Sequence, residues 1–209
     1  MHALTSDFLP EAPCWRRVSA IADLAEIFEP GVQVCSWRRA VDPRIETYLD
    51  GATTSGTAQS IETLAPHERA RLDALPAGDG REALLDDTAL LTEILHELVD
   101  CPIAGLRCTR LEHAMCPGWH VDRIPLRMLC TYRGPGTEWL EDQSVDRDAL
   151  TNSGIADGAF RRAEAGELVL LKGALWQDNE GLGAVHRSPA VRPGTGRRTL
   201  VTLDPLWPG

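Results

Sequence analysis

The second half of this 209-residue chain is a series of short apolar segments separated by turns rich in Gly and Pro. The segments predicted to be strands are Ile103 to Leu111, Leu126 to Tyr132, Glu167 to Lys172, Gly183 to Arg187 and Arg198 to Leu203. Four consecutive apolar residues before Lys172 suit a strand that is buried on both faces. Many short strands between turn signals are typical of an antiparallel β-sandwich or barrel. Residues 101–209 are therefore predicted to form such a β core.

The first hundred residues are predicted to be mainly helical, with one short strand at Val32 to Trp37. The expected helices are Ser19 to Phe28, a helix that starts at Asp42-Pro43, Thr57 to Leu75 with a break at Pro66, and Glu82 to Val99. The last of these carries an apolar stripe at helical spacing, which needs a partner surface. We therefore expect one α+β domain over residues 1–209, in which the helices of residues 1–100 cover one face of the sheet.

Charge and composition exclude several classes of function. The chain has 21 Lys and Arg against 31 Asp and Glu, a net charge of −10, and such a surface repels phosphate backbones. No apolar run approaches the roughly 18 residues of a membrane span, and residues 1–13 lack the pattern of a signal peptide. We expect no nucleic-acid or membrane partner and a cytoplasmic location. Six cysteines without a C-x-x-C pair indicate reduced thiols, mostly buried.

One candidate metal site starts from His120 and Asp122. Residues two apart on a strand point to the same face, so this imidazole and this carboxylate can bind one ion. A His-x-Asp pair alone is common, and the plain alternative is a histidine hydrogen-bonded to its neighbour. His186 follows at the end of a short predicted strand, and two histidines with one carboxylate are the facial triad of non-haem Fe(II) oxygenases. Such a triad leaves open positions on the metal. A competing hypothesis is a zinc site of His113, Cys116, His120 and His186, which leaves Asp122 idle.

The order of motifs resembles that of 2-oxoglutarate-dependent oxygenases, particularly the prolyl-hydroxylase-like branch. The matching pieces are His120 and Asp122, the turn Gly134 to Glu138, Gly166 to Leu170, His186, then Pro189, Val191 and Gly194, and Arg197 or Arg198. The chain is also similar to the domain-of-unknown-function 1826 family. That similarity is carried by Cys116 to Asp122, Leu126 to Trp139, Leu171-Lys172-Gly173 and His186 to Pro189. The oxygenase resemblance implies a double-stranded β-helix (a jelly-roll or cupin-like barrel), Fe(II) held by His120, Asp122 and His186, and 2-oxoglutarate as cosubstrate.

A dicarboxylate cosubstrate needs a fixed cation at its far end, and the resemblance places it at Arg197 or Arg198. Alternation lets only one of the two side chains point inward. Arg197 shares its face with Thr199, Val201 and Leu203, and this more apolar face favours Arg197. Arg198 lies closer to the body of the strand, which favours Arg198.

Two residues of the preceding strand are further candidates for cosubstrate binding, Arg127 and Tyr132. Arg127 shares a face with Leu129 and Thr131, and it either forms a surface ion pair or lies in the mouth of the barrel. Tyr132 is on the other face, which is expected to be mostly core.

These observations lead to a hypothesis of a non-haem Fe(II) dioxygenase that hydroxylates an unidentified small-molecule or peptide substrate. Two alternatives remain at this point: a non-catalytic zinc-binding protein of metal homeostasis, and a cupin-like metal enzyme that does not use 2-oxoglutarate. The sequence does not determine the oligomeric state.

Overall fold

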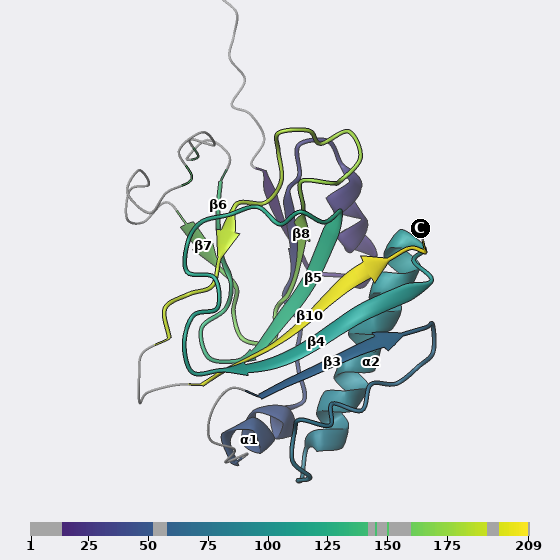
Figure 1. Cartoon of the computed structure of the whole chain (residues 1–209), viewed down its shortest axis with the longest axis vertical. Helices are drawn as coiled ribbons and strands as arrows, with labels where there is room; N and C mark the ends of the chain where they lie inside the picture. The colour runs from purple at the N-terminus through teal and green to yellow at the C-terminus, as the bar shows by residue number, and fades with distance from the viewer. Residues whose placement is uncertain are drawn as a thin grey trace, which may run out of the picture.

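The computed structural model describes residues 14–51, 58–141, 145, 150, 160–191 and 197–208, which form two β-sheets and three helical segments (Figure 1). The larger sheet has seven strands in the order β1-β2-β8-β5-β10-β4-β3. Their bounds are Trp15–Val18 (β1), Val34–Trp37 (β2), Leu168–Lys172 (β8), Leu126–Arg133 (β5), Arg198–Leu206 (β10), Ile103–Leu111 (β4) and Ala58–Leu64 (β3). Strands β1 and β2 are parallel, and the other neighbours in this sheet are antiparallel.

The smaller sheet has three antiparallel strands in the order β7-β6-β9. Its strands are Phe160–Arg162 (β7), Glu138–Leu140 (β6) and His186–Arg187 (β9). The helical segments are a 3-10 helix η1 (Ile21–Phe28) and the α-helices α1 (Pro43–Gly51) and α2 (Arg81–Val99). The expected α+β class is confirmed. In the described residues the two sheets stay separate, so the expected barrel does not close.

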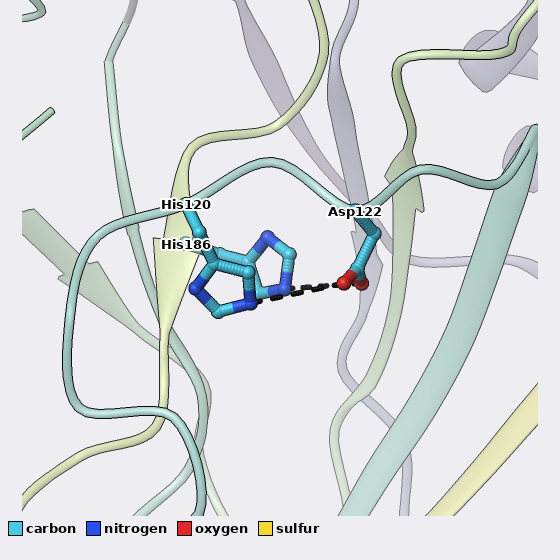
Figure 2. Close-up of side chains that lie close together, drawn as sticks. All are labelled: His120, Asp122 and His186. Carbon is cyan, nitrogen blue, oxygen red and sulfur yellow. Dashed lines mark ion pairs between the residues drawn. The ribbon is translucent and has the colours of Figure 1, made fainter.

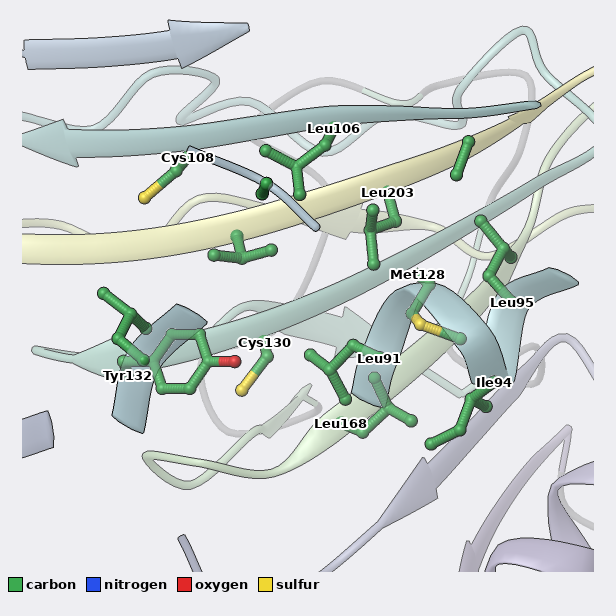
Figure 3. Close-up of a cluster of buried hydrophobic side chains, with 14 of the residues drawn as sticks. Leu91, Ile94, Leu95, Leu106, Cys108, Met128, Cys130, Tyr132, Leu168 and Leu203 are labelled. Carbon is green, nitrogen blue, oxygen red and sulfur yellow. The ribbon is translucent and has the colours of Figure 1, made fainter. Parts of the chain in front are cut away.

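One face of the larger sheet is apolar and packs against α2, as the apolar stripe of residues 82–99 predicts. Leu91 and Leu95 of α2 are fully buried against Met128 of β5, Leu168 of β8 and Leu203 of β10 (Figure 3). Burying a leucine side chain contributes roughly 1.5–3 kcal/mol, so this layer is a main source of stability. The opposite face of the sheet looks toward the smaller sheet, and the space between them holds the site described below.

The predicted helix at Thr57 to Leu75 is wrong throughout, because Ala58–Leu64 is strand β3 and residues 65–75 form turns and irregular backbone. This strand is at the edge of the larger sheet, where it pairs with β4, from Ala58 opposite Arg110 to Leu64 opposite Ala104. Ile61 is 68% exposed, whereas Leu64 is buried. Apolar residues three apart also occur on one face of an amphipathic helix, which is why the sequence predicted a helix here. The segment forms a strand instead because it hydrogen-bonds to β4, about forty residues later in the chain.

Other local predictions are confirmed. Asp42 begins α1 as predicted, since its Oδ1 accepts a hydrogen bond of 2.9 Å from the backbone N–H of Arg44. The first predicted helix is present as the 3-10 helix η1. The strands β1, β6 and β7 were not predicted. No helix in the described ranges has the length and apolar character needed to cross a bilayer.

Candidate metal centre and its cavity

His120 and His186 lie side by side because their backbones form an antiparallel bridge. The N–H of each donates to the carbonyl of the other, at 3.0 Å from His120 and 2.9 Å from His186. Side chains directly opposite each other in an antiparallel pair leave the same face. The two rings are accordingly stacked at an angle, with centroids 4.4 Å apart (Figure 2). Strand pairing thus joins two histidines that are 66 residues apart in the chain.

Asp122 completes a group of three potential metal ligands. Its Oδ1 is 3.7 Å from His120 Nε2, and its Oδ2 is 3.3 Å from His186 Nε2. One ligand atom from each residue lies within 4.8 Å of the other two. Figure 2 shows the carboxylate pointing toward both rings. The structure therefore brings together the three side chains that the sequence singled out.

Backbone carbonyls hold both imidazoles in the tautomer that a metal ligand needs. Nδ1 of His120 is 2.9 Å from the carbonyl of Gly118, and Nδ1 of His186 is 2.9 Å from that of Ala184. A carbonyl only accepts, so each Nδ1 carries the proton and each Nε2 keeps its lone pair on the side of Asp122. Desolvation and the nearby His186 lower the pKa of His120, which favours its neutral form. Two imidazole nitrogens and a carboxylate fit a divalent ion such as Fe(II).

The position of Asp122 depends on a close approach of two loops at Gly173. The backbone N–H of Ala174 donates to the carbonyl of Asp122, and that of Gly173 donates to Pro125, both at 2.8 Å. A Cβ on Gly173 would lie 1.9 Å from the carbonyl oxygen of Ile124. Only glycine fits there, which gives the Leu-Lys-Gly motif a role in placing the carboxylate.

Arg127 fixes the side chain of Asp122 from the floor of the cavity. Its Nη1 donates to Asp122 Oδ2 at 2.6 Å, while its Nε and Nη2 donate to the two oxygens of Asp204 at 2.7 and 2.8 Å. Burial opposes ionisation of Asp122, but His186, when it is protonated and can donate a hydrogen bond to the carboxylate, and the positive charge of Arg127 lower its pKa to about 2. Asp122 is therefore a carboxylate at neutral pH. Of the two alternatives for Arg127, the structure supports the one inside the cavity.

Arg198 is a buried cation in the same cavity. Its side chain donates to the carbonyl of Pro135 at 3.0 Å and to the hydroxyls of Thr137 at 2.8 Å and Thr131 at 3.3 Å. No carboxylate of the described residues forms an ion pair with it. Burial lowers the pKa of Arg198 to about 10, so it stays charged at neutral pH. The cavity has a volume of about 130 Å³, and its lining includes Arg198 together with His120, Asp122 and His186.

Arg197 points out of the cavity. Its side chain is 34% exposed, and its Nε is 3.7 Å from Glu112 Oε1. The argument from apolarity that favoured Arg197 is wrong, because Val201 and Leu203 on its face belong to the core beneath α2. The cavity face of β10 is instead the one with Arg198.

The structure does not bring Tyr132 to the cavity. Tyr132 is buried on the helix-covered face of β5 (Figure 3), where its hydroxyl donates to Asp87 Oδ2 at 2.5 Å. The alternative zinc site is not assembled either. Cys116 is exposed at the edge of the cavity and His113 is exposed outside its lining, and neither joins the ligand group. Gly194, which is part of the resemblance to the oxygenases, lies outside the described residues.

The cavity lining does not include Trp119, Trp139 or Trp176, which pack in apolar clusters instead. Sequence reasoning missed Asp204, because the last strand was predicted to end at Leu203. Asp204 stands six residues after Arg198 and therefore on the same face of β10, so a longer strand would have revealed it.

Comparisons with known proteins agree with this architecture. A family model described as "Protein of unknown function (DUF1826)" matches residues 19–204. No curated protein matches the sequence. The structure is similar to the 2-oxoglutarate complex of AtDAO1, dioxygenase for auxin oxidation 1 from Arabidopsis thaliana. The TM-score is 0.53 and the identity 13%, over 93% of this chain and 92% of that chain. This likeness shows that the two sheets form the predicted double-stranded β-helix.

Two further solved structures have lower scores. The dioxygenase for auxin oxidation in rice gives a TM-score of 0.46 at 17% identity, over 84% of this chain and 74% of that chain. A Pseudomonas putida prolyl-4-hydroxylase gives 0.43 at 12% identity, over 91% of this chain and all of that chain (100%).

Proposed function

The chain belongs to the DUF1826 family, and we propose that it is an Fe(II)- and 2-oxoglutarate-dependent oxygenase. The observation that carries the proposal is the presence of Arg198 in the same cavity as three converging ligand atoms. A buried cation without a carboxylate partner is costly, and a ligand carboxylate would relieve that cost. The triad and the arginine suit the two ends of a 2-oxo dicarboxylate.

Six residues of the cavity lining have roles in this proposal. His120, Asp122 and His186 would hold the iron, which when bound supplies activation of dioxygen for oxidising a C–H bond. Arg198 would bind the far carboxylate of 2-oxoglutarate, and the hydroxyl of Thr137 holds its guanidinium in place. Arg127 keeps the Asp122 carboxylate turned toward the histidines.

The donor set also favours an open metal site over a structural zinc site. Structural zinc sites are closed by four protein ligands. In the described part of the chain the group has three members, and Cys116 and His113 are not among them. Three ligands leave positions for a cosubstrate and dioxygen.

Anaerobic titration with Fe(II), with and without 2-oxoglutarate, tests the proposal. We expect a weak visible metal-to-ligand charge-transfer band only when both are present, because the band requires the 2-oxo acid to bind the iron. Tight metal binding without such a band would reject 2-oxoglutarate and support the zinc protein or the cupin-like enzyme.

A further inference from the structure

The cavity is lined by more arginines than the proposed cosubstrate needs. Four arginines line it: Arg107, Arg127, Arg187 and Arg198. The whole chain has a net charge of −10, so a cationic cavity is not a consequence of overall composition. A cleft with low-dielectric walls concentrates the field of such charges.

Two carboxylates near the cavity, the half-buried Asp204 and the buried Glu138, are each shared between two arginines. Both oxygens of Asp204 bind Arg127, and its Oδ2 also accepts from Arg107 at 3.2 Å. Glu138 accepts from Arg187 Nε at 2.6 Å and from Arg162 Nε at 2.9 Å. Neither carboxylate can neutralise two guanidinium groups, and Asp122, which Arg127 also binds, offsets one further charge.

An excess of positive charge results when the lining arginines are counted with their carboxylate partners and with Arg162, which shares Glu138 with Arg187. The cations are Arg107, Arg127, Arg162, Arg187 and Arg198, and the anions are Asp122, Glu138 and Asp204. Five against three leaves two positive charges among the described residues. A divalent metal and the 2-oxoglutarate dianion cancel each other, so this excess remains when both are bound.

Arg107 is the arginine with the most capacity for another partner. Arg198 is enclosed, and Arg127 holds Asp122 and Asp204. Arg187 is bound to Glu138 and lies over the ring of Trp119 at 4.1 Å. Among the residues that the structure describes, Arg107 forms one ion pair, to Asp204 Oδ2, which Arg127 also binds, and its side chain is 35% exposed.

Arg107 also has polar neighbours on the cavity face. It stands on β4 directly opposite Thr202 of β10, and Thr109 follows two residues later on the same face of β4. An anion at Arg107 would therefore meet a guanidinium flanked by hydroxyl donors.

We propose that the substrate carries a carboxylate or phosphate group that binds Arg107 at the mouth of the cavity. The identification of this anion as part of the substrate rests on the proposed function. Binding of an anion at Arg107 does not itself require the metal. A neutral substrate would cover the two excess charges without compensating them, which is costly in a partly desolvated cavity. The same excess attracts acidic molecules from solution.

The test is calorimetric titration of the full chain in chloride-free buffer, with acetate, inorganic phosphate and neutral acetamide as probes. Each probe is titrated into protein alone and into protein saturated with Mn(II) and 2-oxoglutarate. We expect acetate or phosphate to bind in both states and acetamide to bind in neither. The anion with the higher affinity indicates whether the acidic group of the substrate is a carboxylate or a phosphate.

Variants separate Arg107 from general charge effects. Arg107→Gln should weaken anion binding by about tenfold or more, since it removes a charge-assisted hydrogen bond. Arg107→Lys should restore part of it. The control Arg71→Gln makes the same charge change at a side chain that is 77% exposed and outside this cavity, and it should bind as the wild type does.

Three results would overturn the anion site: no anion binding, binding that disappears once 2-oxoglutarate is bound, or equal binding by Arg107→Gln. The proposed function fails separately, if Mn(II) and 2-oxoglutarate do not bind while Arg107-dependent anion binding persists. Failure of either inference is thus distinguishable from failure of the other.

Discussion

Replacing Arg198 by Met removes the proposed cosubstrate anchor with little change in folding stability. Burial lowers the pKa of Arg198 from its ordinary value of 12.5 to about 10, which corresponds to roughly 3 kcal/mol of penalty on the charged form. Met fills similar space without that penalty. Against this gain stand the lost hydrogen bonds to Pro135, Thr131 and Thr137, worth about 0.5–1.5 kcal/mol each. The two effects roughly cancel, so the free energy of unfolding should change by less than about 2 kcal/mol.

Cosubstrate binding should respond very differently to the same change. A desolvated pair between Arg and a carboxylate contributes roughly 1.5–3 kcal/mol, so Arg198→Met should weaken 2-oxoglutarate binding by about one to two orders of magnitude. Saturation with 2-oxoglutarate at a hundred times its Kd should stabilise the wild type by about 2.7 kcal/mol. The variant at the same ligand concentration should gain much less.

The assay combines denaturant unfolding with titration of 2-oxoglutarate in the presence of Fe(II) under anaerobic conditions. Arg197→Met is the matched control, because Arg197 has the same charge and the neighbouring position but points away from the cavity. We expect normal affinity for Arg197→Met and a strong loss for Arg198→Met. Normal affinity in both variants would refute the assignment of the anchor to β10, and Arg127 would then be the next cation to test.

Three further predictions concern the metal, the core and the domain organisation. His186→Ala should abolish tight metal binding while far-UV circular dichroism stays unchanged, and full metal retention by metal analysis would reject His186 as a ligand. Tyr132→Phe should lower the free energy of unfolding by about 1–3 kcal/mol, because Asp87 loses the hydrogen bond from the Tyr132 hydroxyl. The affinity for 2-oxoglutarate should not change, and weaker cosubstrate binding in titrations would show that Tyr132 contributes to the site. Residues 102–209 expressed alone should not give a soluble protein with a cooperative melting transition. Without the first part of the chain, β8 loses its neighbour β2, β4 loses its neighbour β3, and the apolar face of the sheet is no longer covered by α2. A cooperative transition would show that these residues form an independent β domain.

The parts of the fold that local pattern determines were predictable from the sequence. Helix α2 follows from its apolar stripe, and β5 and β10 follow from β-branched and apolar segments between turns. Strand β3 was not predictable in this way, because its apolar residues Ile61 and Leu64 lie on opposite faces. The sequence of β3 therefore shows no alternation of apolar and polar residues. An edge strand takes its hydrogen bonds from one neighbour, and here that neighbour is distant in the chain.

The three proposed metal ligands could be singled out from the sequence, but their convergence could not be predicted from spacing alone. His120 and Asp122 are close because of the two-residue repeat of an extended backbone. Their distance to His186 depends on the hydrogen bonds between the backbones of His120 and His186, and on the close approach that Gly173 permits. Both are tertiary contacts that no local pattern encodes.

The choice between Arg197 and Arg198 shows that the two-residue alternation of a strand can be read correctly while the face that lines the cavity is chosen wrongly. Alternation separates the two side chains, but apolarity identifies only the face that packs against a helix. On β10 that face carries Val201 and Leu203 beneath α2, and the cavity face carries Arg198 and Thr202. The larger sheet packs against helix α2 with one face and lines a polar cavity with the other. In such a sheet the candidate site residues are expected on the less apolar face. Asp204 lies on the same face of β10 as Arg198, and it holds Arg127 against the carboxylate of Asp122.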